Sequence, residues 1–372
     1  MTKYLSPNEL HEALTLRDLS DPEHGPHAMQ ELLGHVEKAL TRSWGVDART
    51  LRNSPLVSVA DNYDKLGFSA STVTRDQRYS RYASPTVMLR SHTSASVPAL
   101  LRNLSPNKYM DELVVMPGLV YRRDAIDRTH VGAPHQVDLW RIASTPTLAP
   151  RDLESMVAEL VDAVLPGAQW RTVPAVHPYT RHGMQVDVLV GNGWLELAEC
   201  GMMAPGLFAD AGLDPEQWSG LALGMGLDRA LMLRKGIPDI RLLRAGNERI
   251  ASQMLDLEPW QHVSLLPATR RDISIVVPEA FDDEILGDEV RQALGTRMDD
   301  LESVELLDLT PFTELPAAAR DRLRIEPGQA NALIRLVLRP IERTLTAPEA
   351  NLIRDDIYRA LHQGPVMELI AG

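Results

Sequence analysis

The sequence predicts an α+β protein in which an antiparallel sheet is flanked by helices. Alternating side chains in Val186–Val190 lead into Gly191–Gly193, and a second alternating segment follows at once. A glycine-rich turn between two alternating segments is a strong hairpin signal. Several such strands and few helical windows lie between Leu113 and Met203. This pattern favours antiparallel pairing over β-α-β units.

Helical patterns lie on both sides of this region. Ser6 and Glu9 have capping-box spacing, with Pro7 at the first helical position. Apolar residues then recur at the helical period over residues 29–40 and again over residues 152–165. These stripes predict helices packed on the sheet. Gly220–Lys235 reads as a strand that runs into a helix, with a glycine and a proline as its stop.

The last hundred residues have a different order of predicted strands and helices. From Arg270 the pattern is strand, helix, strand, strand, helix and a short closing apolar segment, over residues 273–277, 282–294, 304–309, 332–338, 347–361 and 366–370. This β-α-β-β-α-β order is that of a ferredoxin-like domain.

Composition narrows the class of protein. The 372 residues are 44% hydrophobic, which is ordinary for a globular protein, and no apolar run reaches the roughly 18 residues that cross a bilayer. The N-terminus resembles neither a secretory signal nor a transit peptide, and one cysteine, Cys200, fits a reducing compartment. We therefore expect a cytoplasmic protein without membrane contact. The net charge of −13 means that any nucleic-acid binding needs a local basic face.

Two clusters carry chemistry. Residues 121–138 combine arginines, acids and histidines, a mixture that suits a polyphosphate beside an amine; a solvated charged hairpin is the alternative. The second cluster, Gly224–Arg229, lets a backbone approach a ligand and places a guanidinium beside it. It is not a dinucleotide fingerprint, and the chain has no P-loop. If ATP binds here, arginines on a sheet hold it.

These clusters and their surroundings resemble a known family. The ordered segments are similar to those of class II aminoacyl-tRNA synthetases, closest to the catalytic subunit of the phenylalanyl enzyme. The matching segments are Leu89–Ser94, Val120–Asp138, which resembles motif 2, Gly193–Gly201, and Gly220–Arg241, which resembles motif 3. The C-terminal part resembles the anticodon-binding domain of the same enzymes through Arg271–Ser274 and Arg343–Thr346.

The resemblance implies a division into three parts. Residues 1–84 would hold the N-terminal helices and the start of the catalytic domain, residues 85–258 the class II catalytic core, and residues 265–372 the ferredoxin-like, anticodon-binding-type domain. It also implies an enzyme that uses ATP and Mg²⁺ to activate an amino acid and pass it to tRNA. A monomer or homodimer is expected, because the chain carries its own tail.

Roles for individual residues follow from the same resemblance. Arg122 and Arg229 would be catalytic, holding the α- and γ-phosphates of ATP. His130 would contact the phosphates, Asp124 would lie near the adenine, and Glu196 would hold Mg²⁺. The residues that would bind the amino acid are His92, Ser94, Gln136, Asp138, His177, Tyr179, Glu199 and Ala222.

The chain departs from the family pattern in this pocket. The Phe-Pro-Phe segment that selects a phenyl ring is represented here by His177–Tyr179, and Glu199 replaces a glycine. Buried polar groups without partners cost about 1–3 kcal/mol each, so these side chains should meet the substrate or, for Glu199, Arg181. We therefore expect an amino acid more polar or more cationic than phenylalanine. Strand parity puts Glu196 and Glu199 on one face only if a bulge intervenes.

Two further departures concern ATP and the acceptor. Pro134 stands where the family has the phenylalanine that stacks on adenine, and Val97 replaces a glutamine. From Arg270 to the end there are 12 arginines, no lysine and 20 acidic residues, whereas an anticodon reader favours positive charge. Two alternatives to tRNA charging therefore remain: a tRNA-independent paralogue that transfers the activated amino acid elsewhere, and a catalytically silent binding module.

Overall fold

The computed structural model describes residues 4–72, 75, 80–107, 109–122, 127–262, 266–341, 343–367 and 369. They form two compact units. The first comprises Met1–Arg122, Ala133–Ile237 and Gln253–Trp260, and the second comprises Arg123–Gly132, Pro238–Ser252 and Gln261–Gly372. Each unit has its own sheet and its own core.

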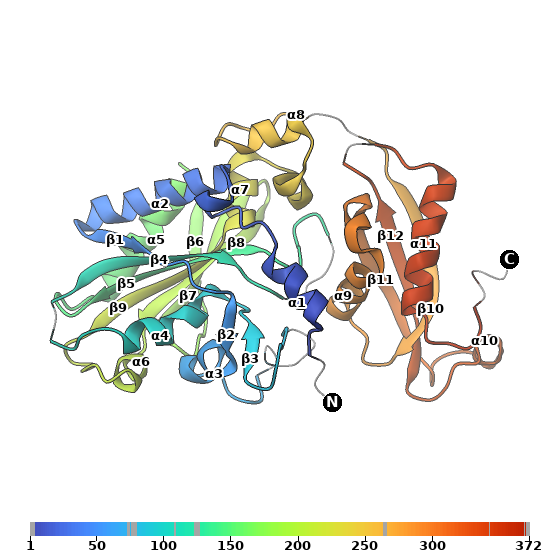
Figure 1. The fold of residues 1–372 in the computed structure, drawn as a ribbon, viewed down its shortest axis with the longest axis horizontal. Helices are drawn as coiled ribbons and strands as arrows, with labels where there is room; N and C mark the ends of the chain where they lie inside the picture. Colours follow the sequence, from blue (N-terminus) through green and yellow to red (C-terminus); the bar gives the residue numbers. More distant parts are fainter. Residues whose placement is uncertain are drawn as a thin grey trace. The chain divides into compact units, whose positions relative to one another are not determined.

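The first unit is built on a seven-stranded sheet, counted over the described residues, in the order β1-β4-β5-β9-β8-β7-β6 (Figure 1). Every neighbouring pair is antiparallel except β1 with β4, which is parallel. The predicted antiparallel sheet is therefore confirmed, with one parallel edge strand that the sequence pattern did not reveal. The strands are β1 (Asp47–Thr50), β4 (Asp111–Leu119), β5 (His135–Ala143), β6 (Trp170–Pro174), β7 (Thr180–Val190), β8 (Gly193–Met203) and β9 (Ser219–Gly226).

Helices cover both faces of this sheet. On one face α2 (Ala28–Trp44), α5 (Pro150–Val164) and α7 (Leu227–Lys235) pack together, and on the other lie α3 (Val59–Asn62), α4 (Val97–Arg102) and α6 (Pro205–Asp210) (Figure 1). A small two-stranded sheet, β2 (Leu56–Ser58) with β3 (Val87–Leu89), lies beside α3. Two 3₁₀ turns, η2 (Asp64–Leu66) and η4 (Thr93–Ser96), complete this side.

The helical signals in the sequence are confirmed. Ser6 and Glu9 form the predicted capping box at the start of α1 (Pro7–Leu14). The predicted stripes bury one face each of α2 and α5. The strand-to-helix transition runs from β9 into α7, which ends on the left-handed Gly236. Within the described ranges, none of the helices has the length and apolar composition that a membrane crossing requires.

The C-terminal part contains five of the six predicted elements in order. These are β10 (Thr269–Pro278), α9 (Asp283–Leu294), β11 (Leu301–Pro311), β12 (Gln329–Leu338) and α11 (Ala347–Leu361), and the sheet order is β10-β12-β11. An additional helix, α10 (Ala317–Leu323), precedes β12. The closing strand predicted over residues 366–370 is wrong for the positions described there, since Val366, Met367 and Leu369 lie outside any strand. An apolar segment forms a strand only where it can pair with a neighbouring strand, and the sequence pattern does not show such a partner.

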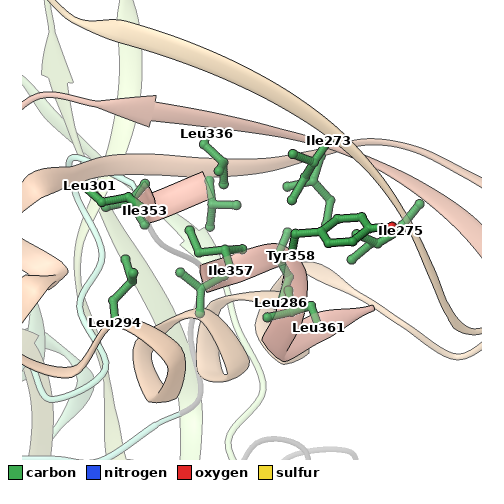
Figure 2. Packing of buried hydrophobic residues seen from close by; sticks show 14 of the residues in the cluster. Ile273, Ile275, Leu286, Leu294, Leu301, Leu336, Ile353, Ile357, Tyr358 and Leu361 are labelled. Atoms are coloured by element: carbon green, nitrogen blue, oxygen red, sulfur yellow. The ribbon is translucent and has the colours of Figure 1, made fainter. Parts of the chain in front are cut away.

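The core of this unit lies between the sheet and one pair of helices. Helices α9 and α11 pack against the same face, where Ile273 and Ile275 of β10 meet Ile357 and Leu361 of α11 (Figure 2). Strand β12 buries every second residue from Ala330 to Leu338, as expected for a strand with one covered face. The alternation in the sequence that predicted this strand therefore corresponds to one buried face of the sheet.

A buried ionic cluster ties the separate segments of the second unit together. Glu302 at the start of β11 is 5% exposed and accepts a 2.8 Å hydrogen bond from Nε of Arg128. Arg339 approaches the other carboxylate oxygen of Glu302 at 3.0 Å. Arg241 donates to the backbone carbonyl of Asp299 at 3.0 Å. Residues from three distant stretches of sequence thus meet around one carboxylate.

Replacing Ile357 by alanine should destabilise the second unit. Ile357 is fully buried between α11 and the sheet, so its truncation leaves a cavity that costs about 2–5 kcal/mol of unfolding free energy. All six tryptophans lie in the first unit, so urea unfolding should be followed by circular dichroism rather than by tryptophan fluorescence. Leu352→Ala on the same helix, at a position 59% exposed, should change stability by less than about 0.5 kcal/mol. Equal losses in both variants would contradict this packing.

Candidate active site

Three neighbouring strands build one face of the candidate site. Asp138 of β5 lies opposite Gly224 of β9, and Gly224 lies opposite Glu199 of β8. The glycine therefore separates two carboxylates that face the same side of the sheet. A Cβ at Gly224 would lie 3.3 Å from the side-chain nitrogen of Gln136, so a larger residue there would press on that amide. The missing side chain keeps the surface between the two acids open.

A β-bulge brings a second glutamate to this face. Val186 pairs with Ala198 but Asp187 pairs with Glu196, so Leu197 is an extra residue in β8. Leu197 and Ala198 are both buried, which breaks the alternation of the strand. Glu196 and Glu199 consequently act on each other: burial and then the charge of Glu199 raise the pKa of Glu196. The bulge that strand parity required is present.

Two arginines from distant parts of the sequence act on the same glutamate. Arg122 follows β4; its Nε donates to the carbonyl of Ser91 at 2.8 Å, and its Nη2 lies 3.4 Å from Oε1 of Gln136. Arg229 lies in the first turn of α7 and donates to the backbone carbonyl of Glu196 at 3.3 Å. Both guanidinium groups lower the pKa of Glu196, against the larger effect of its burial. Two positive charges and two carboxylates therefore share one exposed face.

Asp138 forms a buried acidic corner. It is 2% exposed and accepts hydrogen bonds from the hydroxyl of Thr93, the hydroxyl of Ser94 at 3.0 Å and the indole Nε1 of Trp140 at 3.0 Å. Burial raises the pKa of Asp138, and these three donors oppose that effect. The predicted residues Ser94 and Asp138 are thus in direct contact. Thr93 and Trp140 belong to the same corner, although the sequence reasoning did not include them.

Aromatic rings line the wall beside this corner. Tyr179 stacks on Trp140 with ring centroids 5.9 Å apart and lies 6.1 Å from Phe68. Burial, followed by the charge of Asp138, raises the pKa of the Tyr179 hydroxyl, while a hydrogen bond with Ser94 acts in the opposite direction. The hydroxyl of Tyr179 therefore lies at the acidic corner, and its ring lies on the indole.

His177 meets Glu199 at the rim of this wall. Nε2 of His177 lies 3.2 Å from a carboxylate oxygen of Glu199, and Nδ1 lies 3.1 Å from the hydroxyl of Thr180. The contact with His177 is the largest cause that lowers the pKa of Glu199. Among the described residues Glu199 does not pair with Arg181, so that alternative is wrong. Arg181 lines a separate cavity of about 100 Å³ near Met202.

His92 lies in the same region as a neutral, partly buried side chain. Its ring is 5.7 Å from Phe68 and 6.3 Å from Tyr63, and neither ring nitrogen makes a well-formed hydrogen bond to the described residues. Burial, and then the charge of Arg122, lower the pKa of His92 to about 3, while the Asn62 backbone acts in the opposite direction. At neutral pH the imidazole therefore carries no charge.

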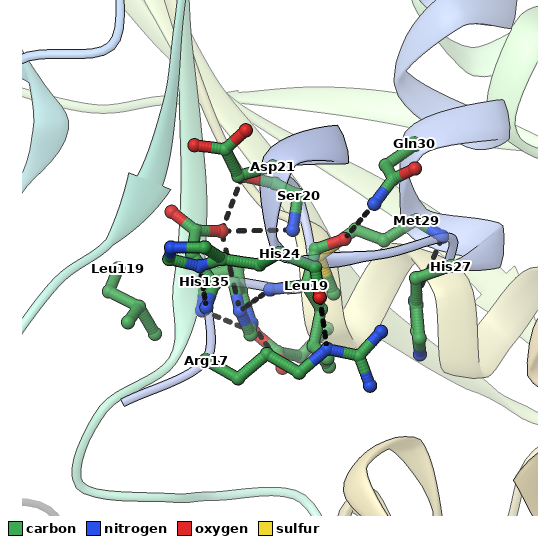
Figure 3. A network of polar contacts seen from close by, with 12 residues as sticks. Arg17, Leu19, Ser20, Asp21, His24, His27, Met29, Gln30, Leu119 and His135 are labelled. Carbon is green, nitrogen blue, oxygen red and sulfur yellow. Dashed lines mark hydrogen bonds and ion pairs between the residues drawn. The ribbon is translucent and has the colours of Figure 1, made fainter. Parts of the chain in front are cut away.

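A second buried pair anchors the residues next to Gln136 and Arg229. Nδ1 of His135 lies 3.0 Å from Asp228. The backbone nitrogen of Leu19 donates to Nε2 of His135 at 2.9 Å (Figure 3). Since Nε2 accepts, Nδ1 carries the hydrogen and donates to the carboxylate. The backbone nitrogen of His135 also donates to Asp228. The N-terminal segment, strand β5 and helix α7 are thereby fixed to one another.

The remaining predicted residues are placed as follows. Ala222 is buried opposite Trp140 on β9, and Val97, fully buried, begins α4. His130 belongs to the second unit, where its Nδ1 lies 2.7 Å from Asp127. Asp124 lies outside the described residues. A magnesium ion needs one or two carboxylates plus phosphate oxygens, and the exposed Glu196 beside Glu199 is a donor set of that kind.

Comparison with known proteins identifies the family. The family model described as tRNA synthetases class II core domain (F) matches residues 15–254. The chain belongs to this class II synthetase family. The match includes the strands β4, β5, β8 and β9 and helix α7, so all the residues of the site face lie inside the family core.

Curated relatives of this class II core are named phenylalanine–tRNA ligases. The alpha subunit of Prochlorococcus marinus is 36% identical over 192 residues, which are 52% of this chain and 56% of the relative. The alpha subunit of Thermotoga petrophila is 34% identical over 217 residues, 58% of this chain and 64% of the relative. The chain thus spans less than two thirds of either subunit. The chloroplastic/mitochondrial ligase of Arabidopsis thaliana is 28% identical over 327 residues, 83% of this chain and 71% of that protein.

Among solved structures, pyrrolysyl-tRNA synthetase from Desulfitobacterium hafniense is similar to this class II core at 19% identity. That likeness covers 64% of this chain and 78% of the other, with a TM-score of 0.47.

The neutral His92 gives this class II core a pH-dependent stability. The unfolded imidazole takes up a proton near pH 6.5 and the folded one only near pH 3, so the unfolded state binds more protons between these values. Stability therefore falls as the pH drops, by about 2 kcal/mol from this residue between pH 7 and pH 5. The His92→Phe variant keeps a ring beside Phe68 and Tyr63. Between pH 7 and pH 5 its free energy of unfolding should fall by about 2 kcal/mol less than that of the wild type. Denaturant unfolding at both pH values measures this; equal losses in the two proteins would refute it.

Proposed function

We propose that this chain uses ATP to activate an amino acid as its aminoacyl-adenylate and transfers the acyl group to tRNA. The observation that supports this most directly is the convergence of Arg122 and Arg229 on Glu196 beside the acidic corner at Asp138. Adenylation needs positioned charge rather than a covalent catalyst, because the charge that develops on the phosphates must be neutralised. Membership of the class II synthetase family supports the same proposal.

In the proposed reaction the amino-acid carboxylate attacks the α-phosphorus of ATP. A new bond forms between a carboxylate oxygen and the α-phosphorus, and the bond from that phosphorus to the pyrophosphate oxygen breaks. Arg122 would neutralise the α-phosphate and Arg229 the γ-phosphate. Mg²⁺, held through Glu196 and phosphate oxygens, would supply additional positive charge on the leaving pyrophosphate. A hydroxyl of the terminal tRNA ribose would then attack the acyl carbon and release AMP.

We propose further that the amino acid is not phenylalanine. The curated relatives carry that name, but the wall at His177, Tyr179 and Glu199 is polar here. Asp138 is available as the anchor for an ammonium group, because its Oδ2 oxygen accepts from Thr93 alone among the described residues and retains a free lone pair. A phenyl ring would lie against charged groups that it cannot satisfy.

ATP–pyrophosphate exchange with each of the 20 amino acids tests this function. We expect exchange with at least one amino acid, and a lower kcat/KM for phenylalanine than for the best substrate. A phenyl side chain would exclude water from this polar wall without offering it a hydrogen bond in return, which accounts for the difference. Phenylalanine as the best substrate would refute the altered specificity, and the absence of exchange with every amino acid would refute activation itself.

Arginine variants on one helix separate charge at the site from helix stability. Arg229→Ala should reduce exchange by about 10²–10³-fold, as expected when a preorganised donor to a developing charge is removed. Arg234→Ala is the matched control, because Arg234 lies in the same helix and, within the described part of the chain, donates to the carbonyl of Val164 alone, at 3.3 Å. If Arg229→Ala retains activity, or if both variants lose it equally, the phosphate role assigned to Arg229 is incorrect.

The acceptor is tested by tRNA binding. The acidic C-terminal domain makes a non-tRNA acceptor the alternative, since a tRNA-binding face here would depend on arginines alone. Gel shift with total tRNA at about 50 mM and 200 mM salt should show binding that weakens steeply with salt if tRNA is the acceptor. Exchange activity without any tRNA shift would favour the tRNA-independent paralogue.

A further inference from the structure

We infer that Trp140 restricts the bound amino acid to a short side chain. This inference rests on the proposed function, because it names the substrate class of the same site. Trp140 lies on β5 two residues after Asp138, so both side chains face the same side of the sheet. No role was assigned to Trp140 from the sequence, yet it contacts the pocket residues predicted on three different segments.

The indole occupies the space between these segments. It donates to Asp138 at 3.0 Å, stacks on Tyr179 at 5.9 Å with planes 23° apart, and lies directly across the strand pair from Ala222. Trp140 is fully buried and belongs to one hydrophobic cluster with residues of α4 and α6. An indole in this position fills the volume that a ring-sized side chain would need beside Asp138.

Its hydrogen bond fixes the indole in place. The indole nitrogen carries one hydrogen, and Asp138 accepts it while also accepting from Ser94 on the same oxygen. Stacking on Tyr179 constrains the other face of the ring. Moving the indole aside for a larger substrate would break a hydrogen bond to a buried carboxylate, so the restriction is rigid rather than adaptable.

The rim of the pocket favours a polar group over a cation. Glu199 already pairs with His177 at 3.2 Å, so its charge is met within the protein. A long cationic side chain would have to displace that pair. A short side chain that ends in a hydroxyl or an amide would not clash with Trp140. It would also leave the pair of His177 and Glu199 intact. The substrate class is therefore an amino acid of the size of serine, threonine or asparagine.

Three Trp140 variants test this size restriction in pyrophosphate exchange. Trp140→Ala leaves a cavity on the order of the roughly 150 Å³ that accommodates benzene, and Trp140→Leu opens a smaller one. Both should raise the kcat/KM ratio of phenylalanine to the best wild-type substrate at least tenfold. Trp140→Phe keeps an aromatic ring against Tyr179 but removes one ring of the indole together with the N–H, so it should change this ratio less than Trp140→Leu does while raising the KM.

The outcomes decide between the alternatives. Wild-type preference for an aromatic, arginine or lysine side chain overturns the inference, and so does an unchanged ratio in a folded Trp140→Leu variant. Trp140→Leu serves as the deciding variant if removal of the whole indole prevents folding. A tenfold gain confined to the Ala and Leu variants supports it.

A binding measurement separates failure of the inference from failure of the proposed function. If the wild type exchanges with no amino acid, activation is refuted, and isothermal calorimetry with L-phenylalaninol replaces the assay. Binding that appears in Trp140→Leu and is absent from wild type and Trp140→Phe supports the size restriction. Equal binding, or equal absence of binding, in wild type and Trp140→Leu overturns it.

Discussion

The buried pair of His135 and Asp228 is the contact on which the geometry of the site depends. An ionisable pair without exposure to water is costly unless each polar atom has a partner. Here the backbone nitrogens of Leu19 and His135 supply hydrogen bonds to the imidazole and to the carboxylate. Asp228 also lies in the first turn of α7, where the helix dipole favours a negative charge.

This pair determines where the next residues along the chain can be. Gln136 follows His135 and Arg229 follows Asp228, so the amide that meets Arg122 and the second guanidinium both start from the same fixed point. The same network reaches Asp18, where His135, Ser20 and Arg52 lower a pKa that burial alone would raise. The N-terminal segment is thus part of the support of the site, even though it carries no predicted catalytic residue.

Periodicity in the sequence was sufficient for the antiparallel strands, the hairpin at Gly191–Gly193 and the helix cap at Ser6, because each shows in residues close together in the chain. It was insufficient where the outcome depends on residues far apart. The bulge at Leu197 shifts the pairing of β7 and β8, and the local pattern of Trp194–Leu197 does not predict it. Parity could only state that a bulge was needed if both glutamates were to face one pocket.

Trp140 illustrates the second limit. Its place two residues after Asp138 was enough to put it on the site face, but an apolar residue in a strand is usually a core residue. Only the stacking on Tyr179, from a segment about forty residues away, shows that it is also a wall of the pocket. A family pattern identifies the site residues at matching positions. It does not identify residues, such as Trp140, that fill the space around them.

The cluster around Glu302 has a consequence for how this protein can be divided. Arg128 and Arg241 come from stretches that lie within the family core in sequence, yet their partners, Glu302 and the backbone of Asp299, lie at the start of β11 and just before it. The second unit is therefore assembled from three separate pieces of chain, and no single cut releases it whole. Exchange of the C-terminal segment between relatives, by recombination or by engineering, would have to replace both sides of this cluster together. We therefore expect substitutions in the C-terminal segment around Glu302 to be accompanied by substitutions in the stretches that hold Arg128 and Arg241.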